Sequence, residues 1–82
     1  MTLAELAPGE TGRVSFLAAQ DPLRRRLIDL GLIQGTLITC MGESPLGDPR
    51  AYGIRGAIIA LRRKDQAAVH LYSRQGGESA WG

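Results

Sequence analysis

The 82-residue sequence contains one cysteine, one histidine and only four aromatic residues, and each scarcity excludes a class of protein. A single cysteine, Cys40, cannot build an internal disulfide framework and fits a reducing compartment. The longest apolar run, Ala57–Leu61, is far shorter than the roughly 20 residues of a membrane-spanning helix. The first residues also lack a basic segment followed by a long apolar stretch. We therefore expect no signal peptide and a cytoplasmic protein.

The scarcity of histidine and cysteine also removes most catalytic and cofactor-binding arrangements. No base accompanies the serines in a recognisable triad motif, and neither glycine-rich phosphate-binding fingerprint occurs. Metal-ligand spacings such as CxxC, HxH or ExxH are missing as well. We predict no catalysis, a core position for Cys40 and an outward-facing, solvated His70. A metal site shared between His70 and a neighbouring carboxylate, or a second molecule, is the alternative.

The net charge is weakly positive, at +2, but the basic residues are clustered. The two clusters are Arg24–Arg26 and Arg62–Lys64. Barrels that bind single-stranded nucleic acid usually place aromatic side chains between such residues. With Phe16 assigned to the core and Trp81 to a C-terminal tail, a stacking platform is poorly supplied. A small nucleic-acid-binding barrel is therefore a minor alternative, and a protein contact is favoured.

The segment from Asp21 to Thr36 predicts a short helix followed at once by a strand. Asp21 is expected to be the N-cap and Pro22 the first helical residue, where no backbone N–H is needed. Gly31 is the residue type that ends a helix in the left-handed conformation. The spacing i, i+4, i+7 predicts one buried stripe, formed by Leu23, Leu27 and Leu30.

Alternating apolar residues predict five short strands around this helix. Their ranges are 12–18, 36–41, 51–55, 57–61 and 68–72. In the first strand, Val14, Phe16 and Ala18 are expected to face inward. A helical turn before Pro8 is opened by the capping box of Thr2 and Glu5, and a second is predicted at 62–67.

This pattern predicts a mostly β fold, a small and strongly bent antiparallel barrel of five strands. One short α-helix lies between the first two strands. The length allows one domain, which we place at residues 1–73. Glycine and polar residues dominate residues 74–82, for which we predict a flexible tail.

Taken in order, these motifs resemble the FeoA family, the small cytoplasmic component of bacterial ferrous iron transport. The resemblance covers residues 2–72. It rests on Leu3-Ala4-Glu5-Leu6 with Pro8-Gly9, Gly12-Arg13-Val14, Leu23 to Leu32 with Gly35-Thr36, Pro45 to Pro49, and Ile54-Arg55-Gly56 leading to Ile59 to Arg62.

The resemblance implies an SH3-like barrel with an accessory or regulatory role and a partner, FeoB, the membrane GTPase-transporter for ferrous iron. Through that partner the protein would lie at the inner face of the cell membrane, and self-association is a further contact to consider. Family membership also implies association with Fe²⁺ or another divalent transition metal, although the residues themselves indicate no ligand set. A metal-binding or sensing module is therefore the alternative function.

For the partner-binding surface, we single out an apolar residue that lies off the predicted stripe. Ile28 falls beside Arg24 on the helical wheel and is either the edge of the core or the first contact of a partner. Arg25, nearby, also predicts a weak surface ion pair with Asp29. The loop from Leu46 to Pro49 supplies a second apolar residue between turn formers. The predicted partner-binding residues are Arg24, Arg25, Ile28, Leu46, Gly47, Asp48 and Pro49.

Overall fold

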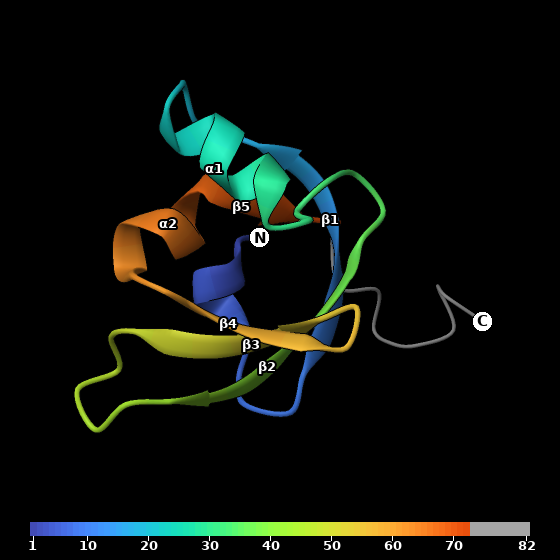
Figure 1. Ribbon diagram of the computed structural model, residues 1–82. Coiled ribbons are helices and arrows are strands. Elements are labelled where there is room, and N and C mark those ends of the chain that lie inside the picture. The colour runs from blue at the N-terminus through green and yellow to red at the C-terminus, as the bar shows by residue number, and fades with distance from the viewer. Residues whose placement is uncertain (73–82) are drawn as a thin grey trace.

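The computed structural model describes residues 1–72, which form a five-stranded antiparallel sheet bent into a small barrel (Figure 1). The predicted tail at 74–82 lies outside the described residues. In chain order the elements are the 3₁₀ turn η1 (Leu3–Glu5), β1 (Thr11–Leu17), α1 (Leu23–Asp29), β2 (Leu37–Glu43), β3 (Arg50–Ile54), β4 (Ala57–Leu61), α2 (Arg63–Ala68) and β5 (Val69–Leu71). The strand order is β4-β3-β2-β1-β5, so the predicted mostly β architecture is confirmed.

The sheet bends at β1, because the two ends of this strand pair with different neighbours. Its first residues, from Thr11 to Arg13, pair with β2. From Val14 onward it pairs with β5 instead. The apolar faces of both halves therefore look toward one interior, in which Cys40 is fully buried as predicted.

The 3₁₀ turn η1 is fastened to the sheet by polar groups inside the core. Tyr52 is fully buried, and its hydroxyl donates to the carbonyl of Leu3 at 3.1 Å. The guanidinium of Arg50 donates to the carbonyl of Ala4 at 3.1 Å. Buried polar groups of this kind must be hydrogen-bonded, so they fix the position of the turn.

Helix α1 begins later than predicted, and the N-cap prediction for Asp21 is wrong. The helix starts at Leu23 with Pro22 as its N-cap, and within residues 1–72 no side chain caps it. The reason is that backbone groups already satisfy the first turn. The N–H of Arg24 donates to the carbonyl of Gln20 at 3.0 Å.

The end of α1 follows the prediction at Gly31 but not at Leu30. Gly31 has φ +101°, and its N–H donates to the carbonyl of Ile28 at 2.9 Å. The N–H of Leu32 donates to the carbonyl of Leu27 at 3.1 Å, which completes a Schellman closure. This turn directs Leu32 into the core, whereas Leu30 remains 38% exposed. The buried stripe therefore ends at Leu27 within the helix and resumes at Leu32.

The inward positions predicted for Phe16 and Ala18 are wrong because β1 contains a bulge. The pairing between β1 and β5 shifts register between Val14 and Phe16. One extra residue reverses the alternation of side chains. Leu17 therefore packs against the core, while Phe16 is 55% exposed. The Phe16 ring stacks on His70, with ring centroids 4.4 Å apart.

The ion pair made by α1 also differs from the prediction. Within the described chain, Arg25 forms no salt bridge with Asp29. The Nη2 atom of Arg26 instead lies 2.7 Å from Oδ2 of Asp65, in α2. Because the Asp65 side chain is only 5% exposed, this contact ties the two helices together.

Candidate partner-binding groove

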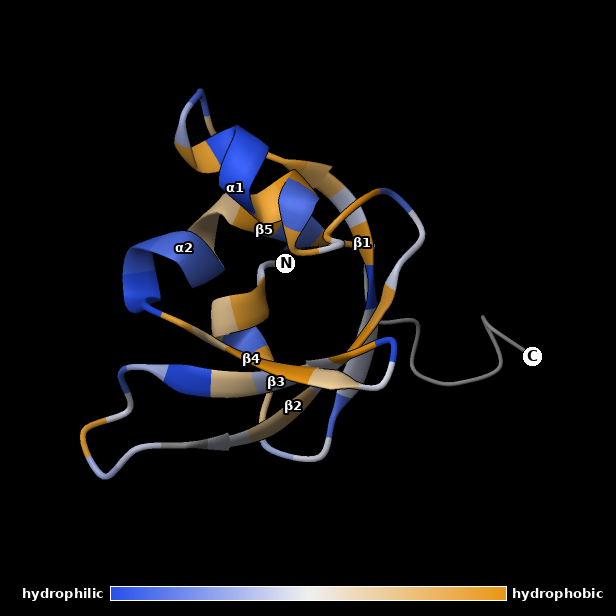
Figure 2. Ribbon diagram, viewed as in Figure 1, coloured by the Kyte–Doolittle hydropathy of each residue, from blue (hydrophilic) through white to orange (hydrophobic). Residues whose placement is uncertain are grey.

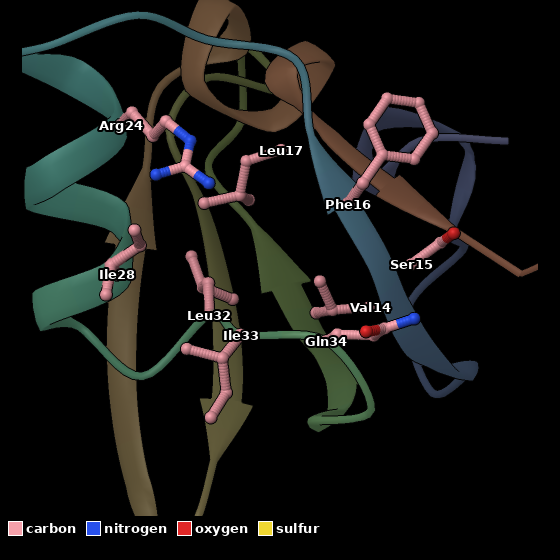
Figure 3. A pocket seen from close by; sticks show the side chains of 9 residues that line it. All are labelled: Val14, Ser15, Phe16, Leu17, Arg24, Ile28, Leu32, Ile33 and Gln34. Atoms are coloured by element: carbon pink, nitrogen blue, oxygen red, sulfur yellow. The ribbon is translucent and has the colours of Figure 1, made fainter.

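A groove of about 270 Å³ runs between α1 and β1 (Figure 3). Its floor includes Val14 and Leu32, both fully buried. The complete lining is Val14, Ser15, Phe16, Leu17, Arg24, Ile28, Leu32, Ile33 and Gln34. The groove is thus built from β1, α1 and the loop that follows α1.

Hydrogen bonds hold the loop after α1 against the first strand. The N–H of Gly35 donates to the carbonyl of Val14 at 2.7 Å, and the N–H of Val14 donates to the carbonyl of Thr36 at 2.9 Å. The hydroxyl of Thr36 donates to the carbonyl of Gly31 at 2.9 Å. These contacts give the groove a preformed wall, which lowers the entropy cost of binding.

The rim of the groove combines apolar and cationic side chains. Ile33 is 44% exposed, and Ile28 is half-buried. The guanidinium of Arg24 extends from α1 across the groove toward Leu17, whereas the Phe16 ring lies on the far side of β1 (Figure 3). An apolar side chain with a carboxylate beside it would contact both kinds of group.

The structure separates the predicted partner-binding residues into two parts. Arg24 and Ile28 line the groove, and Arg25 is exposed on the same helix outside it. The loop that carries Leu46, Gly47, Asp48 and Pro49 joins β2 to β3, far from α1 (Figure 1).

Within that loop, the side chains differ in what they offer a partner. Leu46 is 86% exposed. Asp48 has a structural contact, because its Oδ1 atom accepts the N–H of Arg63 at 3.0 Å at the start of α2. The loop therefore presents mainly one apolar side chain.

Sequence reasoning missed Ile33 and Gln34, which supply one wall of the groove. Both lie between Gly31 and Gly35, whose φ values are +101° and +89°. Two left-handed glycines four residues apart indicate a sharply folded loop. The two glycines on either side of Ile33 were therefore the sequence signal that this residue lies in a tight, protruding loop.

Residues 1–72 contain neither a cluster of metal ligands nor a membrane-spanning helix. In this range, no three His, Cys, Asp or Glu side chains lie close enough together to hold a metal ion. Nor does any helix of the described chain have the length and apolar character needed to cross a membrane.

Comparison with known proteins places these features in a family. Residues 1–72 match the sequence profile of the FeoA domain. A curated relative from Porphyromonas gingivalis, an Fe(2+) transport protein A/Fe(2+) transporter FeoB fusion protein, is 31% identical over 71 residues, or 87% of this chain. The chain spans only 8% of the length of that relative.

Solved structures of FeoA proteins have the same architecture as this chain. The solution structure of the FeoA protein from Chlorobium tepidum has a TM-score of 0.84 and 34% identity, covering 96% of this chain and 75% of the other. FeoA of Stenotrophomonas maltophilia, complexed with zinc and described as a prokaryotic SH3 domain protein, has a TM-score of 0.79 and 28% identity over 88% and 89% of the two chains. A manganese-dependent transcriptional repressor, at 18% identity and a TM-score of 0.79 over 89% of this chain and 41% of its own, shares the fold alone.

Proposed function

The chain belongs to the FeoA family of ferrous iron transport, and on that premise we propose that it is an accessory protein that binds a FeoB-type transporter. In this role it catalyses no reaction itself. It regulates or assembles the transporter by a protein contact, and the groove between α1 and β1 is that contact.

The observation that carries this proposal is the fusion found in P. gingivalis, where one chain combines Fe(2+) transport protein A with the transporter FeoB. Covalent linkage keeps two units at high local concentration, so that even a weak contact is populated. Units that work together without such a link need a binding surface. The groove between α1 and β1 offers such a surface, because exposed apolar side chains lie beside a preformed wall.

The groove has the composition of an interface centre. Ile28 and Ile33 offer apolar area, and Arg24 is the residue type that is enriched where interfaces concentrate their energy. A partner side chain that fills the groove would bury Ile33, which is 44% exposed in this structure. Desolvating that area supplies binding free energy without rearranging the loop.

The direct test is a titration of this chain with the cytoplasmic domain of a FeoB-type transporter. Ile28→Glu removes apolar contact area from the groove and sets a carboxylate four residues from Arg24, where it competes with the partner for that cation. Binding is expected to weaken by about tenfold, which corresponds to about 1.4 kcal/mol. Leu46→Glu introduces the same charge on the distant loop and serves as the matched control. Circular dichroism would confirm that both variants fold.

The two variants give distinct results. Loss of binding with Ile28→Glu alone supports the groove. Loss with Leu46→Glu alone transfers the contact to the loop between β2 and β3. Undiminished binding by both variants would remove the predicted surface, and no binding by the unmodified chain would remove the function.

A further inference from the structure

Strand β4 lies at one end of the sheet, and its geometry shows which backbone groups face outward. A two-residue turn joins β3 to β4, with positive φ at both Arg55 and Gly56, at +50° and +83°. In such a hairpin the flanking residues, Ile54 and Ala57, form a hydrogen-bonded pair. Bonded and non-bonded pairs then alternate along the strands. The N–H and C=O groups of Ile58 and Ala60 therefore point away from β3.

These outward groups are ready to pair with another strand. Within residues 1–72, Ile58 and Ala60 make no backbone hydrogen bond on that side. The strand also has neither the charge nor the proline with which natural sheets discourage pairing at an edge. Side chains give no protection either, since Ile58 is 67% exposed.

A hollow of about 510 Å³ borders this strand on the side of α1. Ala60 and Leu61 contribute one wall, and Leu30, the C-cap of α1, contributes another. Leu30 lies outside the core stripe and is 38% exposed, so its side chain is available to a ligand in this hollow. Figure 2 shows the apolar β4 leading directly into the hydrophilic α2.

Cationic side chains surround the hollow. Arg26, Arg62 and Lys64 all line it. Arg26 is neutralised by Asp65, but Arg62 and Lys64 are exposed and form no salt bridge with any described residue. Their charge is complementary to carboxylates.

We propose that the edge of β4 binds an extended, acidic peptide segment of a partner protein, which joins the sheet as an additional strand. The backbone groups of Ile58 and Ala60 hold the segment, Leu30 contacts an apolar side chain, and Arg62 and Lys64 bind carboxylates. This site is separate from the groove between α1 and β1. It goes beyond the contact proposed above and does not depend on it.

A second copy of the chain fits the edge less well. If two β4 strands paired antiparallel about their centre, the basic residues 62–64 that follow β4 in one copy would approach Arg55, in the turn before β4, of the other. Like charges brought together across an interface disfavour the association. An acidic segment avoids this repulsion.

The experiment is an NMR titration of the full chain with a capped peptide of sequence Glu-Val-Glu-Val-Glu-Val-Glu. We expect the amide signals of Ile58 and Ala60 to shift and to become protected from hydrogen exchange. A peptide of identical charge, N-methylated at the amides that would face β4, is expected to bind about tenfold more weakly because it loses main-chain hydrogen bonds. Equal binding of both peptides would overturn the proposal, since only charge attraction would then be present.

Variants of the chain test the same site from the other side. Arg62→Glu combined with Lys64→Glu should weaken the peptide complex by about tenfold. Each of the two single variants is compared with Arg25→Glu, which makes the same charge change at an exposed residue of α1 that does not line the hollow. Ala60→Pro removes one outward N–H at an edge position that tolerates proline and should also weaken binding.

Three further results are decisive. Peptide binding that survives Ile28→Glu separates this site from the groove, so that either proposal can fail alone. Signal changes centred away from β4 would overturn the assignment. A dimer with protected β4 amides in the absence of peptide would assign the edge to a second copy instead.

Discussion

At the residue scale, the bulge at Ser15 decides which side chains of β1 point into the barrel. The register shift at this position places Phe16 on the outer surface against His70, at 4.4 Å between ring centroids. Leu17 takes the inward place and packs against the core. In this part of β1, the buried apolar area is therefore supplied by Leu17 and not by the larger Phe16.

We expect Leu17→Ala to lower the free energy of unfolding by about 1–2 kcal/mol, because it leaves a gap beside the core. Phe16→Ala should cost less than about 1 kcal/mol, since it removes a mostly exposed ring and one stacking contact. Urea denaturation of the two variants compares them directly. A larger loss for Phe16→Ala would mean that β1 has no bulge in solution.

At the element scale, α1 is a helix of seven residues that cannot be stable alone. Leu27 anchors it in the core, and Leu23 packs at the margin of that core. Its C-terminus is closed by the paired hydrogen bonds at Gly31 and Leu32. The same closure positions Ile33 at the groove, so the end of the helix and the candidate site form one structural unit.

Gly31→Ala is expected to destabilise the protein by about 1–2 kcal/mol, because φ +101° is costly for a residue with a Cβ atom. The nearest atom to that Cβ would be Cγ2 of Ile54 at 3.8 Å, an ordinary contact, so backbone strain is the cause. Gly31→Asn should cost less, since asparagine tolerates this conformation better. Thermal unfolding measures both, and equal losses would indicate a packing effect instead.

At the scale of the whole molecule, three polar contacts connect segments that are far apart in the sequence. Arg26 and Asp65 are separated by 39 residues and join α1 to α2. Arg50 and Tyr52 join β3 to the N-terminal turn through the carbonyls of Leu3 and Ala4. Together they fix the helical elements to the bent sheet, which has β4 and β5 as its two ends.

Removing Arg26 should reduce stability by about 1–2 kcal/mol, because the buried carboxylate of Asp65 loses its charged partner. The value is at the low end for a buried pair, since the Arg26 side chain is itself 58% exposed. Arg25→Ala on the same helix is the control and should change stability by less than about 0.5 kcal/mol. Similar losses in both variants, measured by urea denaturation, would contradict a specific tie between the helices.

Local patterns were sufficient for the order and type of the elements. Val14, Ile38, Val69 and Leu71 are buried as their alternation predicts, and Gly31 ends α1 in the left-handed conformation. These features depend on neighbours within a few residues, where the periodicity of strands and helices acts directly. The family resemblance, which also rests on short motifs, is confirmed over residues 1–72.

Only the tertiary structure decided those features that depend on residues far apart in the chain. Pairing with β5 created the bulge that exposes Phe16, and α2 supplied Asp65 as the partner of Arg26. Folding also separated the loop between β2 and β3 from α1 (Figure 1), although the sequence had combined Leu46 and Ile28 into one surface, and it placed Leu30 beside the edge of β4. The sequence by itself thus determined the fold and its family, because those follow from local periodicity and motifs. The surfaces available to partners were decided by contacts between residues far apart in the chain.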